Sequence, residues 1–333
     1  MMNKQIRVGL IGAGRIGKIH AESIATQVAA ANLVAVADVD LPAAEALGKQ
    51  YSLTVSHDPQ TILHDTSLDA VLICSPTNTH SSLIVAAAQQ GKHIFCEKPI
   101  DLSLNRIDAA IAAVERAGVK LMIGFNRRFD ANFAKVKQMI ADGHIGDPHI
   151  LRITSRDPAP PPISYIQVSG GIFLDLTIHD FDMARFLFGE VVEVYAVGGV
   201  MVDPAIGAAG DIDTAIMSLK FANGAIGSID NSRRAVYGYD QRVEAFGSAG
   251  MVNADNNYPN SHAYYSASGI LREKPFHFFL ERYMPAYGSE IKAFVDCVVN
   301  DTEPPVTGAD GRAPVVIAMA ARQSYRENRP VKI

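Results

Sequence analysis

The chain has 333 residues, 48% of them hydrophobic and 20% charged, a size and composition typical of two globular domains with ample cores. Its net charge of -5, without any basic run, argues against nucleic acid as the main partner. No stretch approaches the roughly 18 uncharged apolar residues of a membrane span, and the first residues lack a signal-peptide layout, so we expect a cytoplasmic protein with no membrane partner.

Residues 6–17 join a short apolar run to three spaced glycines. The run favours a buried parallel strand, and Gly12, Gly14 and Gly17 then follow the G-x-G-x-x-G spacing of dinucleotide-binding turns. Gly12 would permit the tight turn into a helix, Gly14 would let a pyrophosphate approach the backbone, and Gly17 would let the helix pack closely on the strand. The free N–H groups at the start of that helix would hold the phosphates.

A second apolar strand, residues 33–37, ends directly before Asp38. A carboxylate at this point is where the dinucleotide fingerprint needs an acceptor for the ribose 2′-hydroxyl. Val39 and Asp40 follow it, so a 2′-phosphate would meet negative charge without a cationic partner. The sequence therefore favours NAD over NADP as the cofactor.

Strands and helices alternate through the first 125 residues. Apolar runs predict strands at 68–74, 93–96 and 120–125, and helical patterns occupy 42–51, 80–90 and 104–117. This order implies right-handed crossovers, so we predict an α/β Rossmann domain with a doubly wound parallel sheet over residues 1–125.

Polar residues follow two of these strands, at the edge where ligands bind in such sheets. Residues 75–80, reading S-P-T-N-T-H, could line the nicotinamide side of the cofactor, and Glu97, Lys98 and Pro99 follow the next strand. Pro99 biases Lys98 toward an extended conformation, which would aim its ammonium group into the crevice. From position alone, a solvated surface lysine is an equally good interpretation.

Four motifs together resemble the glucose-fructose oxidoreductase / inositol dehydrogenase / rhizopine catabolism family, and within it the inositol dehydrogenases. They read G-A-G-R-I-G-K-I-H-A (12–21), C-E-K-P (96–99), G-F-N-R-R-F-D (124–130) and G-G-I-F-L-D-L-T-I-H-D-F-D (170–182). The resemblance covers essentially the whole chain. It implies a substrate-binding and oligomerisation domain over residues 126–333, an α+β fold with an open, mainly antiparallel sheet through which a homotetramer or homodimer assembles.

The later sequence agrees with this interpretation independently. Strand-like segments lie near 193–200, 214–221, 225–231 and 241–246, with a hairpin signal at Asn223-Gly224. Only a few long helices, around 181–188, 289–299 and 313–325, remain to cover the sheet. We therefore expect one sheet face to stay open, with Met217, Leu219 and Phe221 on it and buried against a partner subunit.

Asp175 and His179 are four residues apart, so they would share one face if 174–188 is a helix. A carboxylate beside an imidazole fixes its tautomer and stabilises its protonated form, as a general base requires. For an arbitrary pair at this spacing, a helix-end carboxylate and a packed histidine are the commoner interpretation. The resemblance instead implies that Lys98, Asp175 and His179 form the catalytic group.

In that group, His179 would accept the hydroxyl proton as hydride leaves for the nicotinamide, Asp175 would orient it, and Lys98 would favour alkoxide character. No metal is needed, and Cys74, Cys96 and Cys297 have no metal-type spacing. The predicted cofactor-binding residues are Gly12, Gly14, Arg15, Ile16, Asp38, Ser75, Thr77, His80, Glu97 and Lys98.

The resemblance also implies substrate contacts, from Asn126, Arg127, Asp157 and Tyr239, with Tyr237 as the alternative tyrosine. The stiff run Pro158–Pro162 either shapes the mouth of the site or is a plain structural crossover. This loop departs from the inositol enzymes, which leaves the exact polyol open.

The resulting hypothesis is NAD-dependent oxidation of myo-inositol or a stereoisomer such as scyllo-inositol to the keto-inositol. An aldose 1-dehydrogenase acting on a pyranose is an alternative, because pyranose ring hydroxyls have a similar arrangement. A non-catalytic dinucleotide-binding regulator is an alternative from another class, but it would not need lysine, aspartate and histidine together.

Overall fold

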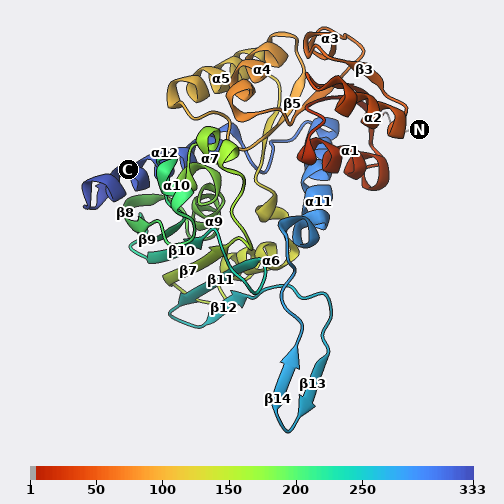
Figure 1. Ribbon diagram of the computed structural model, residues 1–333. Helices are drawn as coiled ribbons and strands as arrows, with labels where there is room; N and C mark the ends of the chain where they lie inside the picture. Colours follow the sequence, from red (N-terminus) through yellow and green to blue (C-terminus); the bar gives the residue numbers. More distant parts are fainter. Residues whose placement is uncertain (1–4) are drawn as a thin grey trace. The chain divides into compact units, whose positions relative to one another are not determined.

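The computed structural model describes residues 5–333, which form two compact units (Figure 1). The first unit contains the chain up to Phe129 and returns for Met284–Ala313, and the second contains Asp130–Tyr283 and Pro314–Ile333. This division differs from the single boundary that we expected after residue 125. The returning segment joins the first unit because the Ile123 amide donates to the carbonyl of Val306 and Phe294 packs on Phe95.

The first unit is built on a six-stranded sheet in the order β3-β2-β1-β4-β5-β6, with every pair of neighbours parallel. This confirms the predicted doubly wound fold. Its strands are β1 (Ile6–Ile11), β2 (Ala31–Ala37), β3 (Thr54–Ser56), β4 (Ala70–Ile73), β5 (His93–Glu97) and β6 (Leu121–Gly124). Since all are parallel, their carboxyl ends lie along one edge of the sheet, where nearly all the predicted cofactor residues stand.

Helices connect these strands and cover the sheet. They are α1 (Arg15–Gln27), α2 (Leu41–Tyr51), α3 (Gln60–Leu63), α4 (Thr77–Gln89), α5 (Leu104–Ala117) and the 3-10 helix η1 (Asn126–Phe129), with parts of α11 (Phe279–Asn300) and α12 (Gly308–Glu327). Helix α5 has the predicted bounds, because Gly118 ends it in the left-handed conformation. The short elements β3 and α3 had no periodic signal and were not predicted.

The second unit contains a seven-stranded sheet in the order β12-β11-β7-β10-β9-β8-β15. Its strands are β7 (Pro148–Arg156), β8 (Val191–Gly199), β9 (Thr214–Phe221), β10 (Ile226–Ser232), β11 (Asp240–Gly247), β12 (Met251–Ala254) and β15 (Val331–Lys332). Only the β7–β10 pair is parallel, so the sheet is mixed but mainly antiparallel, as expected. The helices of this unit are α6 (Ala131–Ala141), α7 (Ile163–Ser169), α8 (Ile172–Asp175), α9 (Ile178–Phe188) and α10 (Pro204–Ala208), with the rest of α12.

The predicted position of Met217, Leu219 and Phe221 on the open face is wrong. These side chains are at most 3% exposed within the single chain, and Phe221 packs on Phe188 of helix α9. Side chains alternate along a strand, so Ile216 is the apolar residue of β9 that faces outward. The open face of the sheet therefore exists, with the opposite set of residues on it.

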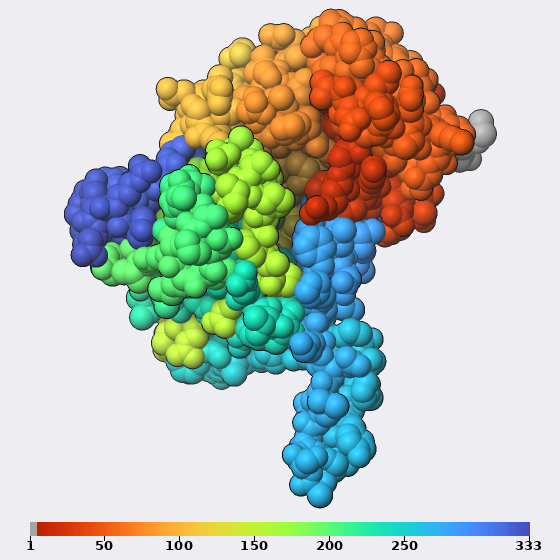
Figure 2. Space-filling view, in the orientation of Figure 1, coloured from red at the N-terminus to blue at the C-terminus, as the bar shows by residue number. Residues whose placement is uncertain are grey.

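A separate hairpin, β13 (Ala263–Ser266) and β14 (Gly269–Arg272), extends away from the sheet of the second unit (Figure 1). It protrudes from the surface in the space-filling view (Figure 2). Its large side chains are exposed, and they pair across the strands as Tyr264 with Leu271 and Tyr265 with Ile270. A two-stranded hairpin with apolar residues on both faces has little stability of its own in water.

Candidate active site

The glycine turn after β1 has the geometry that a dinucleotide requires. Gly12 has a φ of +106°, and a Cβ there would lie 2.5 Å from the carbonyl carbon of Cys74. A Cβ on Gly17 would lie 1.9 Å from the Gly12 carbonyl oxygen, so only glycine lets α1 pack this closely on the turn. A Cβ on Gly14 would meet no atom of the described residues within 4 Å, so its backbone is open to a ligand.

Helix α1 begins at Arg15, next to that open backbone. Among residues 5–333, no side-chain hydrogen bond caps its start, and the backbone N–H groups at the start of a helix are suited to bind an anion. Asp38, at the end of β2, lies beside the same turn and accepts a hydrogen bond from the Ala13 amide at 2.6 Å. Its other oxygen accepts from the Asp40 amide at 2.9 Å, which fixes the carboxylate at the edge of the turn. Val39 beside it is exposed and brings no cation.

His80 joins the two polar segments that follow β4 and β5. Its ring nitrogens lie 2.7 Å from the Ser75 carbonyl oxygen and 2.8 Å from the Pro99 carbonyl oxygen, and the side chain is buried. Ser75 and Thr79 also share a hydrogen bond between their hydroxyls. These contacts hold both strand ends in a defined arrangement, with Lys98 half-buried directly after β5.

Two other predicted residues of the first unit lie inside it. Asn126 and Arg127 begin the 3-10 helix that follows β6, and both are buried. The Glu97 carboxylate also points into the unit, because its Oε1 lies 2.7 Å from Nε2 of His20 in helix α1.

In the second unit, Asp175 and His179 do not lie on one continuous helix, contrary to the expectation for residues 174–188. Helix α8 ends at Asp175 and α9 begins at Ile178, with Leu176 and Thr177 between them. The Thr177 amide donates to the Ile172 carbonyl five residues earlier, which widens the turn and interrupts the regular helix.

Asp175 is held by two donors from other segments. Its oxygens accept hydrogen bonds from the Tyr165 hydroxyl at 2.9 Å and from Nη1 of Arg233 at 3.2 Å. Arg233 is almost completely buried, and its guanidinium also lies 3.6 Å from Asp211. Asp175 is thus a fixed carboxylate beside a buried cation.

A buried polar network anchors the start of α9 to the sheet. Thr177 donates its hydroxyl to the Asn231 amide oxygen at 2.6 Å, and the Asn231 Nδ2 donates to Asp180 at 2.8 Å and to the Ser155 carbonyl at 3.1 Å. Sequence analysis did not identify these residues. The available signal was Asn231 itself, a polar side chain at an inward-facing position of β10.

The two candidate tyrosines have different surroundings. Tyr239 is buried and packs edge-on against Tyr283, with ring centroids 5.9 Å apart. Tyr237 is more exposed, and its hydroxyl donates to Asp240 at 2.5 Å and accepts from Arg156 at 3.2 Å. These contacts hold the Tyr237 hydroxyl in place, and Tyr239 is the more buried of the two tyrosines.

The shifted pKa values of Asp240 and Tyr237 follow from the contacts around them. Burial acts to raise the pKa of Asp240, but hydrogen bonds from Arg242, Tyr237 and Asn256 outweigh it and lower that pKa. Burial and the hydrogen bond to Asp240 raise the pKa of the Tyr237 phenol. Asp157 follows β7 nearby and is half-buried, and its amide donates to the Ser232 carbonyl at 2.9 Å.

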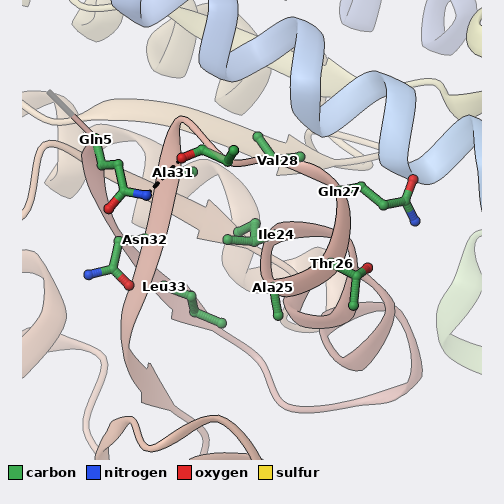
Figure 3. Close-up of a pocket in the computed structure, with 10 residues that line it drawn as sticks. Gln5, Ile24, Ala25, Thr26, Gln27, Val28, Ala31, Asn32 and Leu33 are labelled. Carbon is green, nitrogen blue, oxygen red and sulfur yellow. Dashed lines mark hydrogen bonds between the residues drawn. The ribbon is translucent and has the colours of Figure 1, made fainter. Parts of the chain in front are cut away.

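A separate cavity of about 320 Å³ lies at the opposite edge of the first sheet (Figure 3). It is lined by the end of α1, the start of β2 and Gln5, whose side chain donates to the Ala29 carbonyl. These segments form the amino-terminal edge of the parallel strands, whereas ligands bind at the carboxyl edge. The cavity therefore contributes nothing to the candidate site.

Comparison with known proteins gives matches over nearly the full length. Residues 6–125 match the oxidoreductase family with an NAD-binding Rossmann fold, and residues 133–253 match the GFO/IDH/MocA C-terminal domain. The chain is 50% identical over 330 residues to a myo-inositol 2-dehydrogenase of Thermotoga maritima, covering 98% of each chain. In residues 5–333, no helix has the length and apolar character needed to cross a membrane.

Solved structures are also similar over nearly the whole chain. A probable dehydrogenase from Thermotoga maritima superposes with a TM-score of 0.97 at 50% identity, covering 98% of both chains. A scyllo-inositol dehydrogenase from Lactobacillus casei with bound NAD(H) and scyllo-inositol superposes with a TM-score of 0.92 at 32% identity, covering 99% of both chains.

Proposed function

This chain belongs to the GFO/IDH/MocA family of NAD-dependent oxidoreductases, and we propose that it oxidises a cyclic polyol, myo-inositol or a stereoisomer such as scyllo-inositol, to the keto-inositol. The observation that carries the proposal is the open glycine turn with Asp38 fixed beside it. This turn occurs in a chain that is half identical, end to end, to an inositol dehydrogenase.

The residues of the first unit fit NAD. The backbone from Gly12 to Ile16, Arg15 included, would hold the pyrophosphate at the uncapped start of α1, and Asp38 would accept from the ribose hydroxyls. The segment joined by His80, which carries Ser75 and Thr77, would border the nicotinamide together with Glu97 and Lys98. When bound, NAD supplies the acceptor for the hydride that leaves the polyol carbon.

His179 would take the hydroxyl proton of the polyol, because a neutral imidazole is a suitable base near neutral pH. Asp175 would orient that imidazole. This role is supported by the hydrogen bonds from Tyr165 and Arg233 to Asp175, which leave its carboxylate little freedom to move. Lys98 would stabilise negative charge as it develops on the polyol oxygen.

The polyol itself presents a ring of hydroxyl groups, so polar side chains with fixed positions should recognise it. We assign this role to Asn126, Arg127, Asp157 and Tyr239. Asn126, Arg127 and Tyr239 are buried and Asp157 is half-buried, which limits their movement.

We further propose a homotetramer that works in the cytoplasm. Its support is the exposed apolar surface of the second unit, on the β13–β14 hairpin and at Ile216 of the open sheet face. The three cysteines are free thiols, in keeping with a reducing compartment.

A substrate panel tests the proposal. Purified protein is incubated with inositol stereoisomers and with pyranoses, each with NAD or NADP, and reduced cofactor is followed by absorbance. We expect the highest kcat/KM with an inositol and NAD. Faster oxidation of a pyranose would indicate an aldose dehydrogenase, and NAD binding without turnover of any substrate would indicate a regulator.

A further inference from the structure

Three ionisable side chains meet inside the first unit, each from a different element. His20 lies on α1, Glu97 ends β5 and Glu290 lies on α11, and a nitrogen or oxygen atom from each lies within 4.8 Å of the other two. His20 and Glu290 are completely buried and Glu97 is 9% exposed. His20 and Glu97 form a direct contact of 2.7 Å, so the cluster is already partly bonded.

The surroundings of this cluster are largely apolar. The His20 ring packs edge-on against Phe95 at 5.0 Å and against Tyr287 at 5.6 Å, and Phe294 packs on Phe95. The Tyr287 phenol, Lys98 and the thiols of Cys74 and Cys96 are the other ionisable groups of these segments, and burial together with Glu97 raises the pKa of both thiols well above the ordinary value. Such an environment disfavours additional negative charge.

Glu290 is the unusual member. Among the residues that the structure describes, neither of its carboxyl oxygens has a hydrogen-bond partner, although both are buried. An ionised carboxylate without donors is expensive in such a place, and burial and the charge of Glu97 raise the pKa of Glu290 well above its usual range. A neutral carboxylic acid has one proton to donate, and an oxygen of the Glu97 carboxylate lies within 4.8 Å, beyond a hydrogen bond in this structure but near enough to accept one after a small side-chain rotation.

We propose that Glu290 is held as a neutral acid, that a small side-chain rotation lets it donate its proton to Glu97, and that Glu290 and His20 are positioning residues that hold Glu97, and through it the adjacent Lys98, at the end of β5. His20 of α1 bonds the side chain directly before Lys98, and Glu290 of α11 lies within 4.8 Å of that side chain. The inference rests on the proposed role of Lys98 in polyol oxidation, since a catalytic group needs exact placement.

The alternative interpretation of this cluster is a metal site, because one histidine and two glutamates are suitable ligands. Two atoms bound to the same zinc ion lie roughly 3.3 Å apart in tetrahedral geometry with bonds near 2 Å. Nε2 of His20 and Oε1 of Glu97 are 2.7 Å apart, which is a hydrogen-bond distance. The distance therefore favours a hydrogen bond between His20 and Glu97 over a metal ion bound to both.

The protonation of Glu290 can be measured without any turnover. Infrared difference spectra of wild type and Glu290→Gln at neutral pH should show that the variant lacks one band of an un-ionised carboxylic acid. Loss of a carboxylate band instead would overturn the proposal, as would a stoichiometric transition metal in the purified wild type. Because this experiment needs no substrate, its result is independent of whether the protein oxidises inositol.

Kinetics test the positioning role. Glu290→Gln keeps a neutral hydrogen-bonding group and should retain kcat. Glu290→Leu removes the proposed donor to Glu97 and His20→Phe removes the observed hydrogen bond to it, so both should lower kcat about tenfold or more with little change in the KM for NAD. Asp296→Asn, an exposed position on the same helix, is the matched control and should change neither constant by more than about twofold. Equal losses in Glu290→Gln and Glu290→Leu would contradict a neutral acid, and unchanged kcat in Glu290→Leu would contradict the positioning role.

Discussion

At the scale of single residues, we propose that Asp38 decides whether NAD or NADP binds. Its carboxylate is fixed by the Ala13 and Asp40 amides, so it is ready to accept from a ribose hydroxyl and to repel a 2′-phosphate. We predict that Asp38→Ala weakens NAD binding by about 2 kcal/mol, or about 30-fold, with a smaller effect on NADP. The measurement is kcat/KM for both cofactors, with Glu45→Gln on the exposed face of α2 as a control that changes neither. A wild-type preference for NADP would contradict the assignment.

His179 tests the chemistry at the same scale. If it is the base, His179→Ala should lose about 10² to 10⁴ in kcat, and the wild-type rise of kcat/KM with pH near neutrality should vanish. Asp175→Asn should lose less, because Tyr165 and Arg233 still surround the position and keep the side chain in place. An unchanged pH profile in His179→Ala would direct the search for the base to Lys98.

Glu290 makes a prediction about stability that depends on pH. Its pKa in the folded protein is raised by burial and by Glu97, whereas in the unfolded chain it should stay near the ordinary value of 4.5. The stabilisation from this proton is complete below the unfolded pKa and is lost as pH rises toward the folded pKa, by up to about 1.4 kcal/mol per pH unit. The Tm of Glu290→Gln relative to wild type should therefore increase between about pH 5 and pH 8. Thermal unfolding that gave a constant difference would be evidence against a neutral Glu290.

At the scale of elements, the start of α9 depends on one strand residue. Asn231 bonds Thr177, Asp180 and the Ser155 backbone, all in the interior. Asn231→Leu would leave these groups unsatisfied, so we predict a loss of about 2–4 kcal/mol in the free energy of unfolding and a fall in kcat as His179 is displaced. Ser228→Ala, on the opposite face of the same strand, is the matched control and should behave like wild type. Denaturant unfolding and steady-state kinetics measure both effects.

The sequence predicted elements well where a local signal marked them. Gly118 ends α5 as predicted, and Asn223-Gly224 joins β9 to β10, with Gly224 at a φ of +89°. The sequence did not predict features that depend on contacts between residues far apart in the chain. Strand alternation does not say which face of β9 is covered. No local pattern indicates that Glu290 lies close to Glu97, which is 193 residues earlier in the chain. The break between α8 and α9 at Thr177 likewise has no local pattern, and Thr177 there bonds Asn231, a residue far along the chain.

At the scale of the whole molecule, the question is what covers the exposed apolar surface of the second unit. The β13–β14 hairpin presents Tyr264 and Leu271 as one cross-strand pair and Tyr265 and Ile270 as the other, with each side chain at least 61% exposed. Since such a hairpin is marginal alone, we expect another protomer to cover it. The open sheet face adds four apolar residues that lie side by side on the neighbouring strands β12, β11, β7 and β10. They are Met251, Phe246, Ile150 and Ile226, in that order.

We therefore predict a homotetramer that depends on the hairpin. Changing Tyr265 and Ile270 together to serine should lower the oligomeric state and the Tm, because apolar contact area between protomers is lost while the fold of each protomer is kept. Lys274→Gln, an exposed polar position just beyond β14, is the control and should leave the tetramer intact. Light scattering at micromolar concentration measures the mass, and a wild-type mass of 35.8 kDa would show that no partner covers the hairpin. A tetramer that survives the double serine variant unchanged would leave the open sheet face as the contact surface, to be tested by Phe246→Ser.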